Sequence, residues 1–174
     1  MTAGSLVELL TLIDSSGIAV WLDGGWGVDA LLGTQSRKHK DVDVVIALAN
    51  ADALTSLLAQ HGFRIQDGGR PHNFVVGDNA GREVDVHCVE FDAGGNGIYR
   101  MENGEEWVYP AQGFSGSGSV GGMIVRCLSP EVAVACHADG YEPQEKDFAD
   151  MELLEQRFGV VLPPQLKRRP SSRE

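Results

Sequence analysis

The chain has 174 residues, of which 43% are apolar, and a formal net charge of −11. This length is typical of one compact domain, and the apolar content is sufficient for one hydrophobic core. A protein that holds duplex DNA or tRNA would normally present a basic face, so the charge argues against such a partner. The sequence has no run of about 18 apolar residues, so no membrane-spanning helix is expected.

The cysteines and the N-terminal segment bear on the cellular compartment. Cys88, Cys127 and Cys136 are an odd number of thiols in apolar segments, which favours buried free cysteines in a reducing environment. The first 14 residues contain acidic side chains and no basic ones, unlike a secretory signal. We therefore expect a cytoplasmic protein.

The N-terminal third alternates predicted helices and strands. Leu6, Leu9, Leu10 and Ile13 recur at helical spacing, which predicts a helix over residues 5–13 that Gly17 ends. Asn50 is a candidate cap for a later helix. The other elements expected up to residue 60 are a strand over 18–22, a short helix over 26–32, a strand over 41–48 and a helix over 51–60.

The rest of the chain is expected to form short strands and then two helices. Ser129 and Pro130 are a hydroxyl cap and a first-turn proline, which predict the start of one helix. Residues 1–162 are expected to form a single domain, and the basic, Ser-rich residues 163–174 a disordered tail. The other predicted elements are strands over 63–66, 73–77, 83–89, 98–101 and 107–109, and a last helix over 144–158.

Two aspartates on one predicted strand point to a metal site. Asp41 and Asp43 are two residues apart, so they share one face of the strand. Their neighbours Val42, Val44 and Val45 are apolar, which predicts a central strand. Like charges on a half-buried strand repel unless a cation neutralises them. The natural cation is Mg²⁺, which binds carboxylates together with substrate phosphates.

A third carboxylate and a glycine pair complete the pattern. Asp85 and His87 share one face of another predicted strand, and metal-assisted phosphoryl displacement needs carboxylates that converge from neighbouring strands. Gly24 and Gly25 lie at a predicted strand-to-helix turn, where backbone amides can approach a phosphate. Together these features predict chemistry on a nucleoside triphosphate.

The motifs resemble those of a known superfamily. They are GG-W at residues 24–26, R-x-H-x-D-V-D-V at 37–44 and E-V-D-V-H at 83–87. The chain is similar to the antibiotic nucleotidyltransferases of the lincosamide and aminoglycoside 2″ group, within the polymerase-β-like nucleotidyltransferases. The resemblance spans roughly residues 18–159. It implies an α/β (α+β) fold in which a mixed β-sheet core is flanked by helices and followed by C-terminal helices.

The resemblance also implies a nucleotide end of the site. Gly24, Gly25, Arg37 and His39 are expected beside the nucleotide, although His39 read alone is equally an exposed loop histidine. Lys146 on the last predicted helix is expected to reach the triphosphate; the alternative is an exposed ion pair with Asp150 on the same helix. Trp26 replaces a serine that binds phosphate in many members of the superfamily.

The acceptor end is expected near the third aspartate. Asp85 is the first candidate for a general base and Glu90 the second. His87 is expected to contact the substrate or to order a carboxylate. Tyr141 either lines the acceptor pocket or packs on the core. The Gly/Ser-rich residues 113–122 lack the lysine of a phosphate loop, so they are expected to be a flexible hairpin connection or, less favoured, a mobile loop at this pocket.

The function implied is transfer of a nucleoside monophosphate from an NTP, with ATP favoured, to a hydroxyl of an antibiotic. Asp41, Asp43 and Asp85 are the expected Mg²⁺ ligands. The acidic charge favours a cationic acceptor, a lincosamide before an aminoglycoside, and a homodimer is expected. Three alternatives stay open: a toxin-like enzyme that modifies tRNA or protein, a non-catalytic nucleotide- or metal-binding module, and a plain structural protein.

Overall fold

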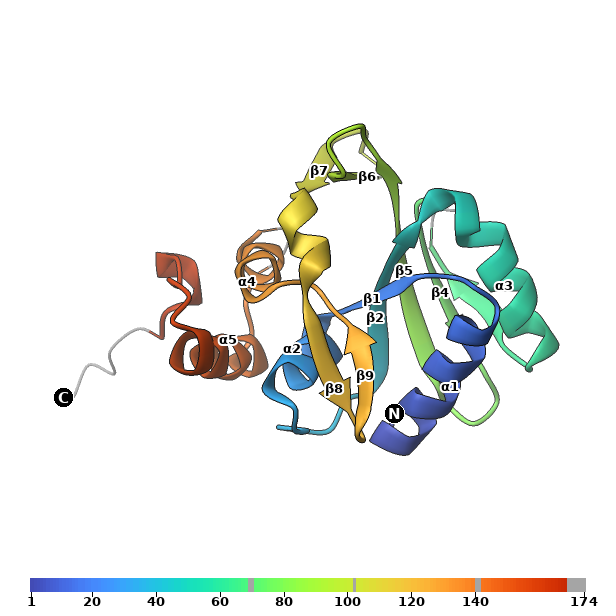
Figure 1. Cartoon of the computed structure of the whole chain (residues 1–174), viewed down its shortest axis with the longest axis horizontal. Coiled ribbons are helices and arrows are strands. Elements are labelled where there is room, and N and C mark those ends of the chain that lie inside the picture. The colour runs from blue at the N-terminus through green and yellow to red at the C-terminus, as the bar shows by residue number, and fades with distance from the viewer. Residues whose placement is uncertain (69–70, 102, 140–141, 169–174) are drawn as a thin grey trace.

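The computed structural model describes residues 1–68, 71–101, 103–139 and 142–168. Figure 1 shows a mixed sheet with helices packed around it and two C-terminal helices at one end. The helices are α1 (Ala3–Ser15), α2 (Gly24–Leu32), α3 (Ala51–Gln60), α4 (Pro130–Ala138) and α5 (Glu145–Phe158). The strands are β1 (Val20–Asp23), β2 (Asp41–Ala47), β3 (Arg64–Asp67), β4 (Asn73–Gly77), β5 (Glu83–Phe91), β6 (Gly97–Arg100), β7 (Glu106–Tyr109), β8 (Ser117–Val120) and β9 (Met123–Arg126).

The main sheet confirms the predicted mixed α/β class. Its strand order is β1-β2-β5-β4-β3, while β6 pairs with β5 and β7 with β6. β2 and β5 run parallel, and β1 and β4 run antiparallel to their neighbours. β2 therefore lies between β1 and β5, the central position that its apolar residues predict.

The two faces of β2 have different surroundings. Val42, Val44 and Ile46 are buried in the main hydrophobic core, which also contains apolar residues of α1 and α3. Because successive side chains alternate between faces, Asp41 and Asp43 lie on the opposite face. β5 has the same pattern, with Val84, Val86 and Cys88 in the main core. One face of the sheet thus stabilises the fold, and the other presents the carboxylates.

The Gly/Ser-rich stretch belongs to a β-hairpin, as expected, but it has regular secondary structure and is not a flexible connection. It forms β8, which pairs antiparallel with β9, and a short 3-10 helix over Ala111–Ser115. A Cβ on Gly118 would lie 2.1 Å from the carbonyl oxygen of Ala30, so the glycine allows β8 to pack directly on the backbone of α2. None of residues 113–122 lines the large pocket described below.

The C-terminal segment also departs from the expectation of a disordered tail. Pro164–Leu166 forms a short 3-10 helix, and the Leu166 side chain is fully buried. It packs in a second core cluster with Val28 of α2, Met151 and Leu154 of α5. Arg168 pairs with Glu145 and Glu152 of α5. Residues 163–168 therefore pack on α5, and residues 169–174 lie outside the described part of the chain.

The helix ends confirm one cap and correct another. The Ser129 hydroxyl accepts the Val132 amide at 3.5 Å, and Pro130 occupies the first turn of α4. Asn50 stands at the N-cap position of α3, but its side chain makes no capping bond. A 3-10 turn over Leu48–Asn50 leads into that helix instead. Cys88 and Cys127 are buried, as predicted, whereas Cys136 is only partly buried.

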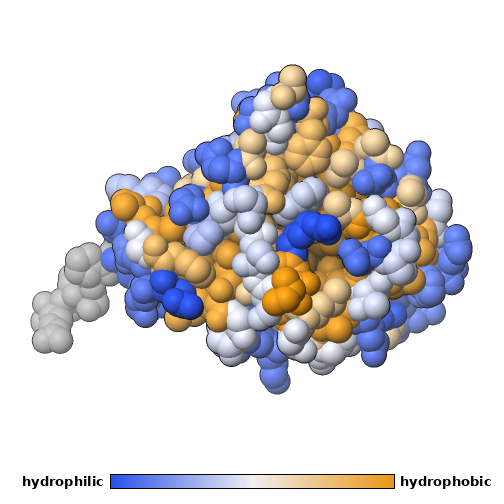
Figure 2. Space-filling model, viewed as in Figure 1, coloured by the Kyte–Doolittle hydropathy of each residue, from blue (hydrophilic) through white to orange (hydrophobic). Residues whose placement is uncertain are grey.

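The surface in Figure 2 mixes polar and scattered apolar residues. Ile124 on β9 and Val161 are among the exposed large apolar residues, at 74% and 85% exposure. Within the described residues, no helix is long and apolar enough to cross a membrane.

Candidate active site

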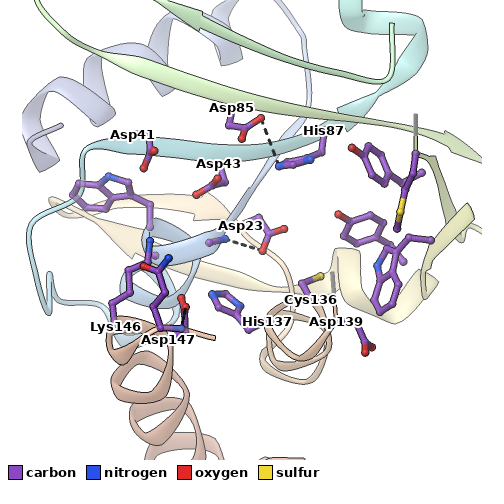
Figure 3. A pocket seen from close by; sticks show the side chains of 18 of the residues that line it. Asp23, Asp41, Asp43, Asp85, His87, Cys136, His137, Asp139, Lys146 and Asp147 are labelled. Atoms are coloured by element: carbon purple, nitrogen blue, oxygen red, sulfur yellow. Dashed lines mark hydrogen bonds and ion pairs between the residues drawn. The ribbon is translucent and has the colours of Figure 1, made fainter. Parts of the chain in front are cut away.

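A pocket of about 1110 Å³ opens on the carboxylate face of the sheet. Its walls come from the start of α2, from α4 and α5, and from the β6–β7 hairpin, and side chains from these elements point into a common space (Figure 3). The volume slightly exceeds the usual range for small-molecule sites, which suits two substrates bound together. The ionisable and aromatic residues that line it are Asp23, Trp26, Arg37, His39, Asp41, Asp43, Asp85, His87, Tyr99, Glu105, Glu106, Trp107, Tyr109, Cys136, His137, Asp139, Lys146 and Asp147.

The strand register brings three carboxylates together. Asp43 of β2 is paired with Asp23 of β1 on one side and with Asp85 of β5 on the other. Residues in register on adjacent strands have their Cβ atoms about 5 Å apart on one face. The pairing of Asp43 with Asp85 confirms the predicted convergence. Asp23, which the sequence analysis did not single out, adds a third acidic strand position beside them.

This crowding raises the pKa of two aspartates. Burial, together with the charges of Asp23, Asp41 and Asp85, raises the pKa of Asp43 from 3.8 to about 6. Burial and the charges of Asp41 and Asp23 also raise the pKa of Asp85, although His87 partly opposes this. A site where carboxylates resist ionisation gains free energy when a cation binds.

The donor set fits a divalent cation. Ligand atoms of Asp43, Asp85 and His87 lie within 4.8 Å of one another. Asp85 Oδ1 is buried without a hydrogen-bond partner among the described residues, and His87 Nε2 lies 3.8 Å from it. Carboxylate oxygens are what Mg²⁺ prefers. Asp41 lines the same pocket but is not part of this close group. The closest set of candidate ligands therefore contains His87 in addition to Asp43 and Asp85, and not the predicted Asp41.

The glycine pair is required by close packing. Gly24 has φ +54°, and a Cβ there would lie 2.1 Å from Asp43 Oδ2. Its amide donates to Asp23 Oδ1 at 2.7 Å, so Asp23, and not a phosphate, already binds this N–H group. The other amides in the first turn of α2 have no partner within the helix, and two of the residues that carry them, Gly25 and Trp26, line the pocket.

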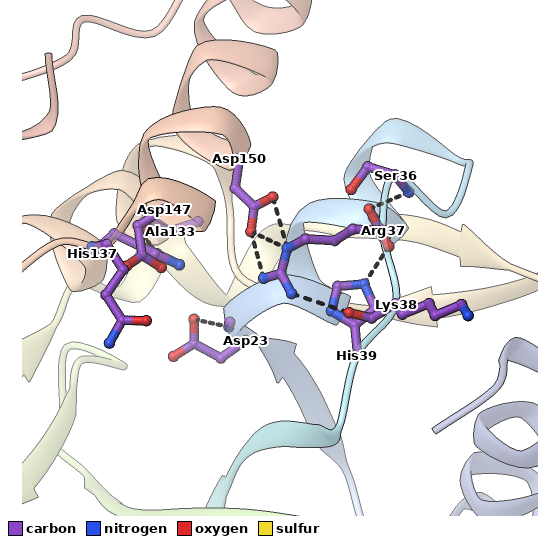
Figure 4. Close-up of polar contacts among 12 residues, drawn as sticks. Asp23, Ser36, Arg37, Lys38, His39, Ala133, His137, Asp147 and Asp150 are labelled. Atoms are coloured by element: carbon purple, nitrogen blue, oxygen red, sulfur yellow. Dashed lines mark hydrogen bonds and ion pairs between the residues drawn. The ribbon is translucent and has the colours of Figure 1, made fainter. Parts of the chain in front are cut away.

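Arg37 and His39 line the pocket next to each other (Figure 4), and both lie close to Gly25. Arg37 donates to both carboxylate oxygens of Asp150 on α5, at 2.7–3.2 Å. The His39 ring is 7% exposed and packs on Trp26 with the ring centroids 4.6 Å apart. Its Nε2 donates to Asp29 Oδ2 at 2.5 Å, so His39 is not an exposed loop residue.

Lys146 lies on the α5 wall of the pocket. The alternative ion pair with Asp150 is not formed, because Asp150 binds Arg37 instead. Lys146 is exposed and makes no ion pair with a carboxylate in the described part of the chain. It is therefore accessible to a ligand in the pocket.

Glu90 does not belong to the site, which corrects its expected role as a substrate contact or second base. The alternation of β5 places it on the same face as Val86 and Cys88, opposite Asp85. Its side chain is 47% exposed and pairs with Arg100 at 3.1 Å. Tyr141 lies outside the described residues.

Several pocket residues gave no clear sequence signal. Tyr99, Trp107, Glu105 and Glu106 come from the β6–β7 hairpin, and Asp139 follows α4. Their spacing shows no catalytic pattern, because the hairpin reaches the pocket through its pairing with β5. Asp23 had a weak signal, since an aspartate directly before a helix is a common N-cap.

Comparisons with known proteins agree with this geometry. The family model for aminoglycoside-2''-adenylyltransferases matches residues 5–154. A lincosamide resistance protein of Staphylococcus haemolyticus is 27% identical over 154 residues, which cover 88% of this chain and 94% of that protein. A 2''-aminoglycoside nucleotidyltransferase of Escherichia coli is 30% identical over 60 residues, 34% of each chain.

Solved structures show the same relationship. The crystal structure of lincosamide antibiotic adenylyltransferase LnuA with bound lincomycin has a TM-score of 0.79 and 26% identity, covering 89% of this chain and 97% of that one. ANT(2'')-Ia in complex with adenylyl-2''-tobramycin has a TM-score of 0.67 and 20% identity over 88% and 87% of the chains, a likeness of fold. These findings confirm the resemblance seen in the motifs: the chain belongs to the aminoglycoside-2''-adenylyltransferase family and is a nucleotidyltransferase.

Proposed function

We propose that the protein transfers a nucleoside monophosphate from an NTP, with ATP favoured, to a hydroxyl of a small cationic antibiotic, a lincosamide before an aminoglycoside. The observation that supports this most is the meeting, in one pocket, of the Asp43–Asp85–His87 cluster with an acidic and aromatic wall. The family description supports ATP as the donor.

Asp43 and Asp85, with Asp41 and His87 beside them, are the residues proposed to hold Mg²⁺. The bound ion would neutralise charge on the triphosphate and on the leaving pyrophosphate. Lys146 and Arg37 supply positive charge on the wall formed by α5 and the 37–40 loop. The free amides at the start of α2 add hydrogen-bond donors for the same phosphates.

Asp85 is the proposed general base for the acceptor hydroxyl. A carboxylate at its ordinary pKa is a weak base. Burial raises the pKa of Asp85 in the metal-free protein, but a Mg²⁺ ion bound to Asp85 would lower it again, so the proposed base role requires Asp85 to face the acceptor hydroxyl rather than the ion. Of the two candidate general bases, Asp85 lines the pocket and Glu90 does not.

The acceptor end favours a molecule with one cationic centre and apolar surface. Tyr99, Trp107 and Tyr109 offer aromatic surface, while Glu105 and Asp139 supply negative charge. Aromatic rings bind apolar groups and cations, and carboxylates attract amines. A lincosamide has one basic amine, which fits this mixture better than the many amines of an aminoglycoside. The lincomycin-bound relative supports the same choice.

The test is a pyrophosphate-release assay with Mg²⁺ that crosses the four NTPs with lincosamides and aminoglycosides. Mass spectrometry of the products would show a gain of one nucleoside monophosphate on one drug class, and Asp41→Asn is the inactive control. Nucleotide binding with no release for any drug would contradict the antibiotic acceptor. Labelling of tRNA or protein in lysate would then favour the toxin-like alternative.

A further inference from the structure

The C-terminal helix α5 is tied to the nucleotide end of the site by one buried carboxylate. Asp150 is 1% exposed, and it accepts three hydrogen bonds from the Nε and Nη2 groups of Arg37, a residue 113 positions away. Asp150 does not line the pocket, whereas Arg37 does, with 29% of its side chain exposed. Asp150 therefore acts on the pocket only through Arg37.

The position of the Arg37 guanidinium is set by what it packs on. A Cβ on Gly25 would lie 2.5 Å from Arg37 Nη2 and 2.5 Å from His39 Nδ1. The guanidinium thus lies directly against the turn that opens α2, beside the His39 ring that Asp29 holds. A bidentate contact fixes the orientation of a guanidinium as well as its location, and the bond to Asp150 raises the pKa of Arg37 further.

We propose that Asp150 is a positioning residue for the nucleotide: it holds Arg37 where the guanidinium meets the triphosphate beside Gly25. A guanidinium has five N–H groups. Asp150 uses the Nε–H and one Nη2–H, and Nη1 donates to the Lys38 carbonyl at 3.5 Å, which leaves one N–H of Nη1 and one of Nη2 for a ligand. Arg37 freed from Asp150 would sample many rotamers, and a misplaced charge binds a phosphate less tightly. This inference rests on the proposed function.

The coupling runs in both directions. If Asp150 orders Arg37 for the nucleotide, the bound nucleotide must in turn stabilise the contact between Arg37 and α5, because coupling between two sites is reciprocal. Nucleotide binding is therefore expected to slow hydrogen exchange of the α5 amides around Asp150. In Asp150→Asn, nucleotide binding is expected to leave the exchange rates of the same amides unchanged.

The experiment measures the Kd for Mg-ATP by titration calorimetry without an acceptor, and kcat and KM in the transfer assay. The variants are Asp150→Asn, Arg37→Gln, their double mutant and Asp78→Asn. Asp78 is a matched control, because it pairs with Arg82 at 2.6 Å and does not line the pocket. The exposed side-chain fractions are 7% for Asp78 and 30% for Arg82, close to the 2% and 29% of Asp150 and Arg37. Circular dichroism melts show whether each variant is folded.

We expect Asp150→Asn to raise the Kd and KM for ATP about tenfold, with little change in kcat or in the KM for the acceptor. The double mutant should bind ATP no more weakly than Arg37→Gln alone, because both changes act through one guanidinium. A merely structural role would lower melting temperature and active fraction without raising KM. If Asp150→Asn does not fold, Arg37→Lys keeps the charge but loses the bidentate contact and should raise the Kd severalfold.

Three results would overturn the inference. The first is an Asp150→Asn protein that binds ATP within twofold of wild type, as Asp78→Asn is expected to do. The second is an Arg37→Lys protein with unchanged ATP affinity. The third is a double mutant whose losses multiply. If any of these occurs while the wild type transfers a nucleotide, the inference fails alone; a wild type that binds no nucleotide overturns the proposed function as well.

Discussion

At the scale of single residues, the most informative group is Asp43, because its surroundings oppose its own charge. It is paired in register with Asp23 and Asp85, and burial with their charges raises its pKa to about 6. A fold keeps such a group only if something else is gained. The proposed gain is a bound divalent cation. Removal of the Asp43 charge should therefore raise the stability of the metal-free protein and lower its transfer activity.

We predict that Asp43→Asn stabilises the metal-free protein while abolishing transfer. A carboxyl group whose pKa is higher in the folded protein binds more protons there, so wild-type stability falls as pH rises from 3.8 through about 6. The asparagine variant lacks this loss and should be more stable at pH 8 by up to about 3 kcal/mol. The difference should vanish below pH 4.

Urea denaturation at pH 4 and pH 8, with EDTA present, measures this difference. Addition of Mg²⁺ should raise the melting temperature of the wild type and not that of Asp43→Asn. Equal stability of the two proteins at pH 8 would show that Asp43 is ionised without cost, and the electrostatic account of the site would then be wrong.

Gly24 supplies a second prediction at this scale. Its φ of +54° and its contact with Asp43 Oδ2 leave no room for a side chain. We expect Gly24→Ala to destabilise the fold by about 1–2 kcal/mol through backbone strain and, in addition, to displace Asp43 and remove transfer activity.

Gly17→Ala is the matched control for Gly24→Ala, because Gly17 has φ +78° and open space around its Cβ position. It should show a similar loss of stability in denaturation experiments but retain kcat for the folded fraction. Full activity in Gly24→Ala would contradict the packing argument.

At the scale of elements, the C-terminal 3-10 helix is a part of the core and not a tail. Leu166 is fully buried between α4 and α5, and such leucines lose about 2–5 kcal/mol on truncation to alanine. We expect Leu166→Ala to fall in this range by urea denaturation. Arg168→Ala, which removes only exposed ion pairs, should cost less than about 1 kcal/mol. Equal losses of stability in the two variants would instead favour a disordered C-terminal tail.

Most elements could be predicted because their sequence patterns are local. The spacing of Leu6, Leu9 and Leu10 fixed α1, and the alternation around Asp43 and Asp85 fixed β2 and β5. β8 was missed because its glycines have low strand propensity, and only the tertiary contact of Gly118 with the α2 backbone explains them. Leu166 was missed because one apolar residue in a basic segment has no periodicity.

The site was predictable where chemistry depends on spacing along one strand. Asp43, Asp85 and His87 follow from alternation alone. Asp150 could not be assigned from sequence, because its partner Arg37 is 113 positions away and the ion pair with Lys146 was locally reasonable. Glu90 was misassigned for a simpler reason: it lies an odd number of residues from Asp85, so alternation already places it on the other face.

At the scale of the whole molecule, the net charge of −11 has a local counterpart in the pocket. Among the described residues, eight carboxylates line it together with Arg37 and Lys146; they are those of Asp23, Asp41, Asp43, Asp85, Glu105, Glu106, Asp139 and Asp147. Clefts lined by one sign of charge concentrate ligands of the opposite sign. The proposed divalent cation would offset the carboxylates at the nucleotide end, and a cationic acceptor would offset those at the other.

The last prediction separates these two ends. Glu105 and Asp139 are exposed residues in the part of the pocket proposed for the acceptor, so their field is screened by salt. We expect Glu105→Gln with Asp139→Asn to raise the KM for a cationic antibiotic about threefold to tenfold at low ionic strength and to leave the KM for ATP unchanged. The difference from wild type should shrink at 300 mM salt, where the Debye length is only about 5–6 Å.

Glu90→Gln is the control, because Glu90 is also acidic and exposed but lies outside the pocket. If Glu90→Gln raises the acceptor KM as much as the double variant, the attraction is a property of overall charge, and the acceptor end would have to be sought elsewhere in the pocket.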